Sequence, residues 1–348
     1  MDLLQFCLRG GNLLIPSIIL KISRAFVTVS FLWYNSETMT AEVDKSVDIK
    51  EVLGEASVAA LFIYPIKSCG GSPLKKAEVI LTGFKHDREL MLVFPDGRFI
   101  SQRDRGCERL ALVQPDFIAS NLIRVIAPNM PELYVPIVKD GKTIEASIHK
   151  TSGIQVVDQG EDASKWFGEY LNTDCKLVAM YQGYERQVSQ RWAPRESDQV
   201  GFADGYNFLL ISQESLDDLN ERLPEPLPMN RFRPNIVLAG NGIPYGEDQM
   251  KKIRIGDVIF DVVKPCIRCN ITMVDQEKGE RDDGEMQKEP LKTLATYRIT
   301  ELKTGDKGPI FGQNLVHQNT GEVSLEDKVQ ILATQPSPVF ISILSIYF

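Results

Sequence analysis

The sequence predicts a mainly β protein of the α+β class, in which two successive β-barrel-like units carry a few peripheral helices. Three observations lead to this prediction. From residue 57 onward, short apolar runs follow one another closely, as in a small barrel or sandwich, and turn residues separate them. Helical periodicity occurs in only two segments. The length of 348 residues corresponds to two domains at roughly 150 residues each.

The composition excludes several broad classes of protein. With 43% hydrophobic and 25% charged residues, the chain is neither disordered, collagen-like nor a coiled coil. The 47 acidic and 39 basic residues give a net charge of -8, so we expect no nucleic-acid partner, and an anionic ligand would need a local basic patch. Few cysteines favour a reduced, intracellular setting over a disulfide framework. They are Cys7, Cys69, Cys107, Cys175, Cys266 and Cys269.

The first unit is expected over residues 57–183. Its strongest local signal is a hairpin at Pro95-Asp96-Gly97, between β-like runs at 89–94 and 98–101. A helix at 165–171 is expected because Trp166, Phe167 and Tyr170 fall at helical spacing. The other expected strands lie at 58–64, 110–113, 122–126, 134–137, 153–157 and 176–180.

The second unit is expected over residues 184–333, beginning with a linking loop at 184–198. Ser212 is expected to cap a helix over 215–223, which would bury Leu216 and Leu219. The densely charged segment 275–290 is expected to be a solvated loop. The expected strands lie at 208–211, 235–239, 252–255, 258–263 and 329–332.

The two ends of the chain look less globular than the rest. We interpret residues 1–56 as a targeting or irregular extension, because residues 1–35 are basic, apolar and almost free of acidic residues. An organellar presequence is the first interpretation and an interfacial membrane anchor the second, since Lys21 and Arg24 interrupt any membrane span. Residues 334–348 form an irregular apolar tail that is too short to span a bilayer.

The most specific local motif is the Cys-x-x-Cys pair Cys266 and Cys269, which follows the strand expected at 258–263. A structural zinc site would need further ligands, and no second such pair or paired histidines occur. A thioredoxin-type dithiol would need a helix after the motif, but residues 271–274 look β-like. Inert buried thiols remain possible. Arg268 between the cysteines instead favours a thiolate that binds a transition metal or lies beside an anion.

Basic residues recur at turns in both units. Lys67 and Ser68 precede two glycines, which together have the chemistry of an anion cradle. Arg88 and Arg233 each precede an expected strand. Singly, each is typical of a solvated surface, but together they could bind an anionic, phosphate-bearing cofactor near a thiolate.

In chain order, several motifs resemble the MOSC family. The motifs are Tyr64-Pro65-Ile66-Lys67-Ser68, Asp87-Arg88, Phe232-Arg233-Pro234-Asn235-Ile236-Val237, Cys266-Ile267-Arg268-Cys269, Val274-Asp275, Lys288-Glu289-Pro290-Leu291 and Phe311-Gly312-Gln313-Asn314. Within that family the chain is similar to the branch of mitochondrial amidoxime-reducing components, plant members included. The resemblance implies a MOSC N-terminal β-barrel domain at 57–183, a MOSC domain at 184–333, and a pyranopterin molybdenum cofactor at their junction.

The resemblance also implies which residues form the site. The family's metal-binding cysteine matches Cys269, which is therefore the expected metal ligand and catalytic residue, with Cys266 a neighbour. The residues expected to bind the anionic cofactor are Lys67, Ser68, Arg88, Asp204, Arg233, Asn235 and Arg268. The sequence departs from animal relatives at Tyr206, where they have a serine, so near that position only Asp204 is carried over.

The implied reaction is the two-electron reduction of N-hydroxylated compounds such as amidoximes and hydroxylamines. Family members take electrons from cytochrome b5 and its NADH-dependent reductase, and the chain carries no dinucleotide fingerprint of its own. We therefore expect these two protein partners, a mitochondrial location with possible membrane association through the N-terminus, and a cytoplasmic location as the alternative.

Two alternatives to a reductase remain open at this stage. One is a carrier that binds molybdenum cofactor without catalysis. The other is a sulfurase-like MOSC binding module, although sulfurases use a pyridoxal-phosphate domain for which we expect no room before Val58.

Overall fold

The computed structural model describes residues 18–22, 25–31, 41–43, 50, 53–240 and 242–339. The chain divides into two compact units, Met1–Val52 and Leu53–Phe348. In the first unit, β1 (Ile18–Ile22), β2 (Ala25–Phe31) and β3 (Ala41–Val43) form an antiparallel sheet. The rest of the predicted presequence or anchor, and the tail beyond residue 339, lie outside the described residues. Within the described part, no helix is long and apolar enough to cross a membrane.

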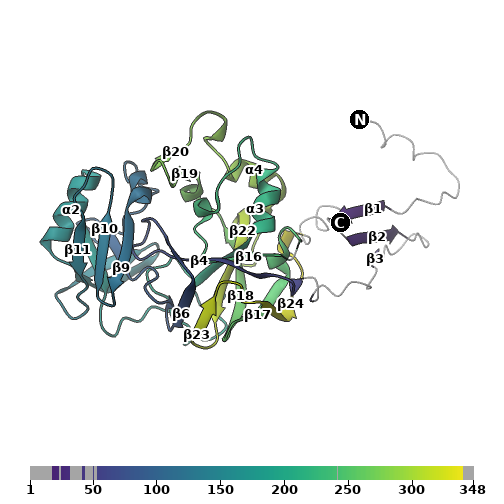
Figure 1. Ribbon diagram of the computed structural model, residues 1–348, viewed down its shortest axis with the longest axis horizontal. Coiled ribbons are helices and arrows are strands. Elements are labelled where there is room, and N and C mark those ends of the chain that lie inside the picture. Colours follow the sequence, from purple (N-terminus) through teal and green to yellow (C-terminus); the bar gives the residue numbers. More distant parts are fainter. Residues whose placement is uncertain are drawn as a thin grey trace. The chain divides into compact units, whose positions relative to one another are not determined.

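The second unit is built around one nine-stranded sheet (Figure 1). Its strand order is β24-β17-β18-β22-β15-β16-β4-β5, and β21 adds to β22. Of these pairs only β15 and β16 run parallel. The strands are β4 (Ser57–Ile63), β5 (Ser72–Leu74), β15 (Phe208–Ser212), β16 (Ile236–Ala239), β17 (Met250–Ile255), β18 (Val258–Ile267), β21 (Ile299–Glu301), β22 (Lys307–His317) and β24 (Val329–Thr334).

Smaller sheets complete the β structure and confirm the predicted mainly β class. The strands lie in the orders β12-β13-β14-β8, β11-β10-β9, β23-β6-β7 and β19-β20. They are β6 (Lys76–Ile80), β7 (Gly83–Phe84), β8 (Leu90–Val93), β9 (Gln114–Ala119), β10 (Leu122–Ile126), β11 (Leu133–Pro136), β12 (Thr143–Ile148), β13 (Thr151–Asp158), β14 (Lys176–Met180), β19 (Val274–Asp275), β20 (Glu280–Arg281) and β23 (Gly321–Ser324).

The helices are few and short. They are α2 (Glu161–Leu171), α3 (Gln213–Asn220) and α4 (Leu291–Tyr297), with 3₁₀ turns η1 (Glu108–Leu112), η2 (Met229–Phe232), η3 (Gly246–Gln249), η4 (Asn270–Met273) and η5 (Gly284–Met286). As predicted, Ser212 caps α3, because its hydroxyl oxygen accepts a hydrogen bond from the Ser215 amide. α2 begins earlier than expected, after Gly160.

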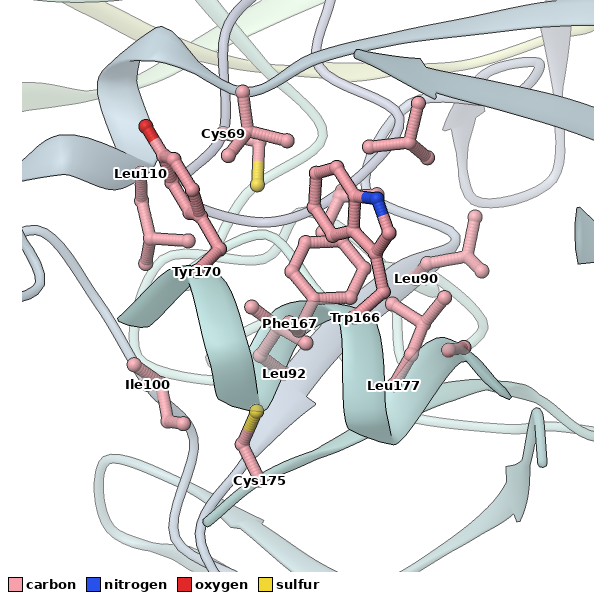
Figure 2. Packing of buried hydrophobic residues seen from close by; sticks show 14 of the residues in the cluster. Cys69, Leu90, Leu92, Ile100, Leu110, Trp166, Phe167, Tyr170, Cys175 and Leu177 are labelled. Atoms are coloured by element: carbon pink, nitrogen blue, oxygen red, sulfur yellow. The ribbon is translucent and has the colours of Figure 1, made fainter. Parts of the chain in front are cut away.

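The core beside α2 explains two of the cysteines. Figure 2 shows Trp166, Phe167 and Tyr170 reaching from α2 into a cluster of apolar side chains that includes Cys69 and Cys175. Burial raises the pKa of both thiols to about 12. They are therefore protonated at neutral pH, and we interpret them as part of the packing.

Several expectations about elements are wrong. Residues 110–113 lie largely in the 3₁₀ turn η1, and 271–274 mostly in η4, where apolar runs were taken for strands. The segment 98–101 contributes isolated bridges and no strand. Residues 275–290, expected to be a solvated loop, are exposed at half their positions, but they include the end of β19, β20 and η5, and Asp275 and Asp282 pair with the buried Arg231 at 3.1 and 2.5 Å.

The sheet order shows how the predicted units are joined. β4, from the segment assigned to the first unit, pairs antiparallel with β16, and β6 pairs with β23. The boundaries at 57–183 and 184–333 stay predictions. Because β4 runs antiparallel to β16 and β15 runs parallel to it, the C-terminal end of β4 lies at the same end of the large sheet as the N-terminal ends of β15 and β16.

Candidate functional site

A cavity of about 170 Å³ lies at the end of the large sheet where β4 ends and β15 and β16 begin. All eight residues predicted to form the site line it. They are Lys67, Ser68, Arg88, Asp204, Arg233, Asn235, Arg268 and Cys269. The structure therefore brings together residues from five separate segments of the chain, and their roles in binding stay predictions.

Strand pairing explains why these segments meet. Lys67 and Ser68 follow β4, whereas Arg233 and Asn235 precede β16, its antiparallel partner. The backbone amide of Phe62 donates to the carbonyl of Asn235 at 2.9 Å. Asp204 precedes β15, which runs parallel to β16, so it approaches the cavity from the same end of the sheet.

Three of the site residues have an unusual backbone conformation. Ser68, Arg88 and Arg233 adopt positive φ angles of 70°, 48° and 56°. Residues with a Cβ atom rarely occupy this left-handed region, and such positions concentrate at functional sites. The Arg88 amide is held by a 2.9 Å hydrogen bond to the Tyr64 carbonyl, and the Arg233 amide by one of 3.2 Å to Asn230.

The ring of Tyr64 supports two of the arginines. The guanidinium carbons of Arg88 and Arg233 each lie 4.2 Å from its centroid. The Tyr64 hydroxyl donates to the carbonyl of Pro234 at 3.0 Å, and burial raises the pKa of this phenol to about 12. Tyr64 is thus a neutral platform that holds two like charges close together.

Arg88 is fixed by a further network of hydrogen bonds. Its Nη1 donates to Asp87 Oδ2 at 2.6 Å and to Asn235 Oδ1 at 3.0 Å. The Asn235 side chain also donates to the Phe62 carbonyl at 3.1 Å. Because both ends of this amide are engaged, Asn235 lines the cavity chiefly as a residue that positions Arg88.

Arg233 and Arg268 are buried without a carboxylate partner in the described part of the chain. Arg233 donates to Gln276 Oε1 at 3.3 Å, and burial lowers its pKa to about 10. Arg268 donates to Cys266 Sγ at 3.0 Å and to the Phe232 carbonyl at 2.8 Å, and its Nε has no partner. Buried cations without anions are costly, which favours a site for an anionic ligand.

Lys67 lies against the one acidic residue of the cavity. Its Nζ donates to the Phe202 carbonyl at 2.9 Å and contacts Asp204, and burial lowers its pKa to about 8. Lys67 and His149 hold the pKa of Asp204, whose side chain is largely exposed, well below the usual range. His149 Nε2 lies 3.1 Å from Asp204 Oδ1.

Cys269 is partly exposed in the cavity, and the sequence did not predict the arginine that contacts it. Arg103 Nη1 lies 4.0 Å from Cys269 Sγ, and Arg103 lines the same cavity. Its position in the sequence does not distinguish it from other arginines near turns. In the described residues, no group of three or more His, Cys, Asp or Glu side chains could hold a metal ion.

The donor set fits an anionic, metal-bearing cofactor better than a simple ion. Five cationic side chains line the cavity, and only one carboxylate does. They are Lys67, Arg88, Arg103, Arg233 and Arg268. A cysteine sulfur is an effective ligand for soft and transition metals, and guanidinium groups bind phosphate oxygens in pairs.

Comparisons with known proteins identify related families and proteins. The family model described as the MOSC N-terminal beta barrel domain matches residues 55–174, and that of the MOSC domain matches residues 197–330. Mitochondrial amidoxime-reducing component 1 of Mus musculus is 35% identical over 289 residues, which are 79% of this chain and 82% of the relative. The protein of the same name from Homo sapiens is 32% identical over 79% of this chain and 83% of its own length. Mitochondrial amidoxime reducing component 2 of Macaca fascicularis is 31% identical over 78% of this chain and 82% of its own length.

Proposed function

We propose, from the premise that this chain belongs to the MOSC family, that it is a molybdenum-cofactor-dependent reductase of N-hydroxylated compounds. The family resemblance expected from the motifs is confirmed by both domain matches and by the relatives. Those relatives are named for amidoxime reduction, which supports oxidoreductase activity of this chain. Amidoximes and hydroxylamines are the substrates that we propose.

The observation that carries the proposal is the convergence of the cations beside Cys269. In this assignment Arg88, Arg233 and Arg268 bind the anionic groups of the cofactor, together with Lys67 and the Ser68 hydroxyl. The thiolate of Cys269 is the protein's ligand to molybdenum. When bound, the cofactor supplies the two-electron redox chemistry by which an N–O bond is cleaved and the oxygen leaves as water.

The protein's own contribution is to bind the cofactor and to control which molecules can reach it. Tyr64 and Asn235 keep two guanidinium groups in place before the cofactor arrives, so little ordering remains to be done on binding. Asp204 neutralises Lys67, and an anionic group of the cofactor that replaced Asp204 would keep the lysine paired. Because Cys269 is partly exposed, a small substrate can approach it.

Electron supply and location complete the proposal. We propose that cytochrome b5 and its NADH-dependent reductase deliver the electrons. The relatives are named as mitochondrial proteins, which supports a mitochondrial location. A role of the N-terminal segment in reaching that location, or in membrane association, is proposed from its sequence alone.

Reconstituted turnover tests the proposal. Protein from a host that makes molybdenum cofactor is mixed with benzamidoxime, cytochrome b5, its reductase and NADH, and benzamidine formation is measured. A chemical reductant in a parallel assay separates slow electron delivery from absent catalysis. We expect reduction that is lost in Cys269→Ala. Stoichiometric molybdenum without reduction by either electron source would make the chain a carrier instead.

A further inference from the structure

A second cavity, of about 460 Å³, shares a wall with the first. Phe99, Arg103, Ser147 and His149 line it, and Arg103 lines both cavities. His149 belongs to the turn between β12 and β13, whereas Phe99 and Arg103 follow the hairpin turn after β8. The second cavity is therefore formed wholly by residues N-terminal to the Cys-x-x-Cys motif.

Direct contacts connect this cavity to the candidate cofactor site. The Phe99 ring lies 4.9 Å from Lys67 Nζ and 5.6 Å from the guanidinium carbon of Arg103. His149 stacks edge-on against Phe99, with ring centroids 5.0 Å apart, and also contacts Asp204. A molecule in the second cavity would thus lie beside the residues that surround Cys269.

Among the described residues, two charged side chains that line the second cavity have no ion-pair partner, the exposed Asp96 and Arg103. Arg98 pairs with Asp104 at 2.8 Å, and the other Asp104 oxygen accepts from the Ser101 amide at 2.8 Å. Asp96 is exposed, and its Oδ1 accepts from the Arg98 amide at 3.0 Å. Arg103 donates from Nε to Ser101 Oγ at 3.3 Å. Among the residues that the structure describes, no carboxylate lies within 4 Å of its guanidinium.

We propose that this second cavity is a substrate subsite, and that Arg103 makes it select compounds that carry a carboxylate. The inference rests on the proposed reductase function and names the substrate class more closely. A planar guanidinium binds a carboxylate through two parallel hydrogen bonds, and Arg103 has no acidic partner to displace. The N-hydroxyl end of such a substrate would then face Cys269, while its carboxylate is held by Arg103.

Kinetics with a matched pair of substrates test the subsite. Benzamidoxime and 4-carboxybenzamidoxime are compared in the loaded wild type, in Arg103→Gln and in the control Arg105→Gln, which removes an exposed charge outside both cavities. A charge-assisted hydrogen bond corresponds to about tenfold in affinity. We expect the wild type and Arg105→Gln to show about a tenfold lower KM for the carboxylated compound, and Arg103→Gln to lose that ratio.

Two measurements besides turnover make the result specific. Calorimetry follows binding of 4-carboxybenzamide, which has no N–O bond to reduce, and molybdenum content is measured in each variant. An unchanged KM ratio in Arg103→Gln would overturn the subsite, as would loss of molybdenum in that variant, since Arg103 would then hold the cofactor. If the loaded wild type reduces neither compound yet binds the amide through Arg103, the subsite stands and the reductase function fails.

Discussion

Replacement of Tyr64 by leucine tests the idea that one ring pre-positions two cations. The ring contacts both Arg88 and Arg233 at 4.2 Å, and each such desolvated contact contributes about 1–2 kcal/mol. Tyr64→Leu should therefore lower the free energy of unfolding of cofactor-free protein by about 2–4 kcal/mol. Tyr64→Phe keeps the ring and loses only the hydrogen bond to Pro234, so it should cost about 1 kcal/mol.

Urea unfolding of the three cofactor-free proteins measures this difference, and molybdenum content after purification reports its effect on the cofactor. An independent variant is Gly71→Ala, whose Cβ would lie 2.6 Å from a Tyr64 ring carbon and so displace the ring. We expect it to resemble Tyr64→Leu in molybdenum content. Equal stability of the leucine and phenylalanine variants, with full molybdenum in both, would refute the argument.

Three further predictions concern charge and pH. Arg231→Met leaves Asp282 unpaired and Asp275 with only the exposed Lys278, so it should destabilise the protein by about 3–5 kcal/mol. Arg222→Met, which removes a half-exposed cation, should cost less than about 1 kcal/mol in urea unfolding. Burial lowers the pKa of His317 to about 4, so its contribution to stability is present above pH 6.5 and is lost as the pH falls towards 4. Between these pH values the wild type should lose about 3 kcal/mol more than His317→Gln, and equal pH profiles would contradict this. Burial lowers the pKa of Lys67 to about 8, so the lysine loses its positive charge between pH 7 and pH 9. Sulfate binding by cofactor-free protein, measured by calorimetry, should therefore weaken over this range. Lys67→Met should lose that pH dependence.

Local sequence patterns were sufficient to predict where several of the strands lie. β10 and β14 have the predicted bounds, because each is an apolar run flanked by turn residues. The partners of the strands were not predictable in the same way. β4 has a strand pattern whether it pairs within the first unit or, as observed, with β16, more than 170 residues away.

Contacts between residues far apart in sequence were also not predictable at the candidate site. Lys67, Arg88, Arg233 and Cys269 lie in motifs whose residues are close in sequence, so a family resemblance identifies them together. Arg103 reaches Cys269 across 166 residues of chain, and no local pattern distinguishes it from other arginines near turns. The contact of Arg103 with Cys269 becomes visible only in the folded structure, where these two distant segments line one cavity.

Charge density was the most misleading signal. The segment 275–290 looked solvated, yet Asp275 pairs with the buried Arg231, and Gln276 bonds both Arg233 and Gln102. The pattern of charges in one segment does not show that its partner is a buried arginine elsewhere. Helix α4 was also missed, because it is only seven residues long, although Pro290 directly before it is a typical helix-start residue.

The central claim is that the sulfur of Cys269 is the protein's ligand to molybdenum. Cys266 offers a matched control, since it lines the same cavity, is also partly exposed and lies three residues away. Molybdenum per chain is measured by mass spectrometry in the wild type, Cys266→Ala and Cys269→Ala from the same host. We predict equal metal in the first two and its loss in the third. Retention in Cys269→Ala, with loss in Cys266→Ala, would contradict the account.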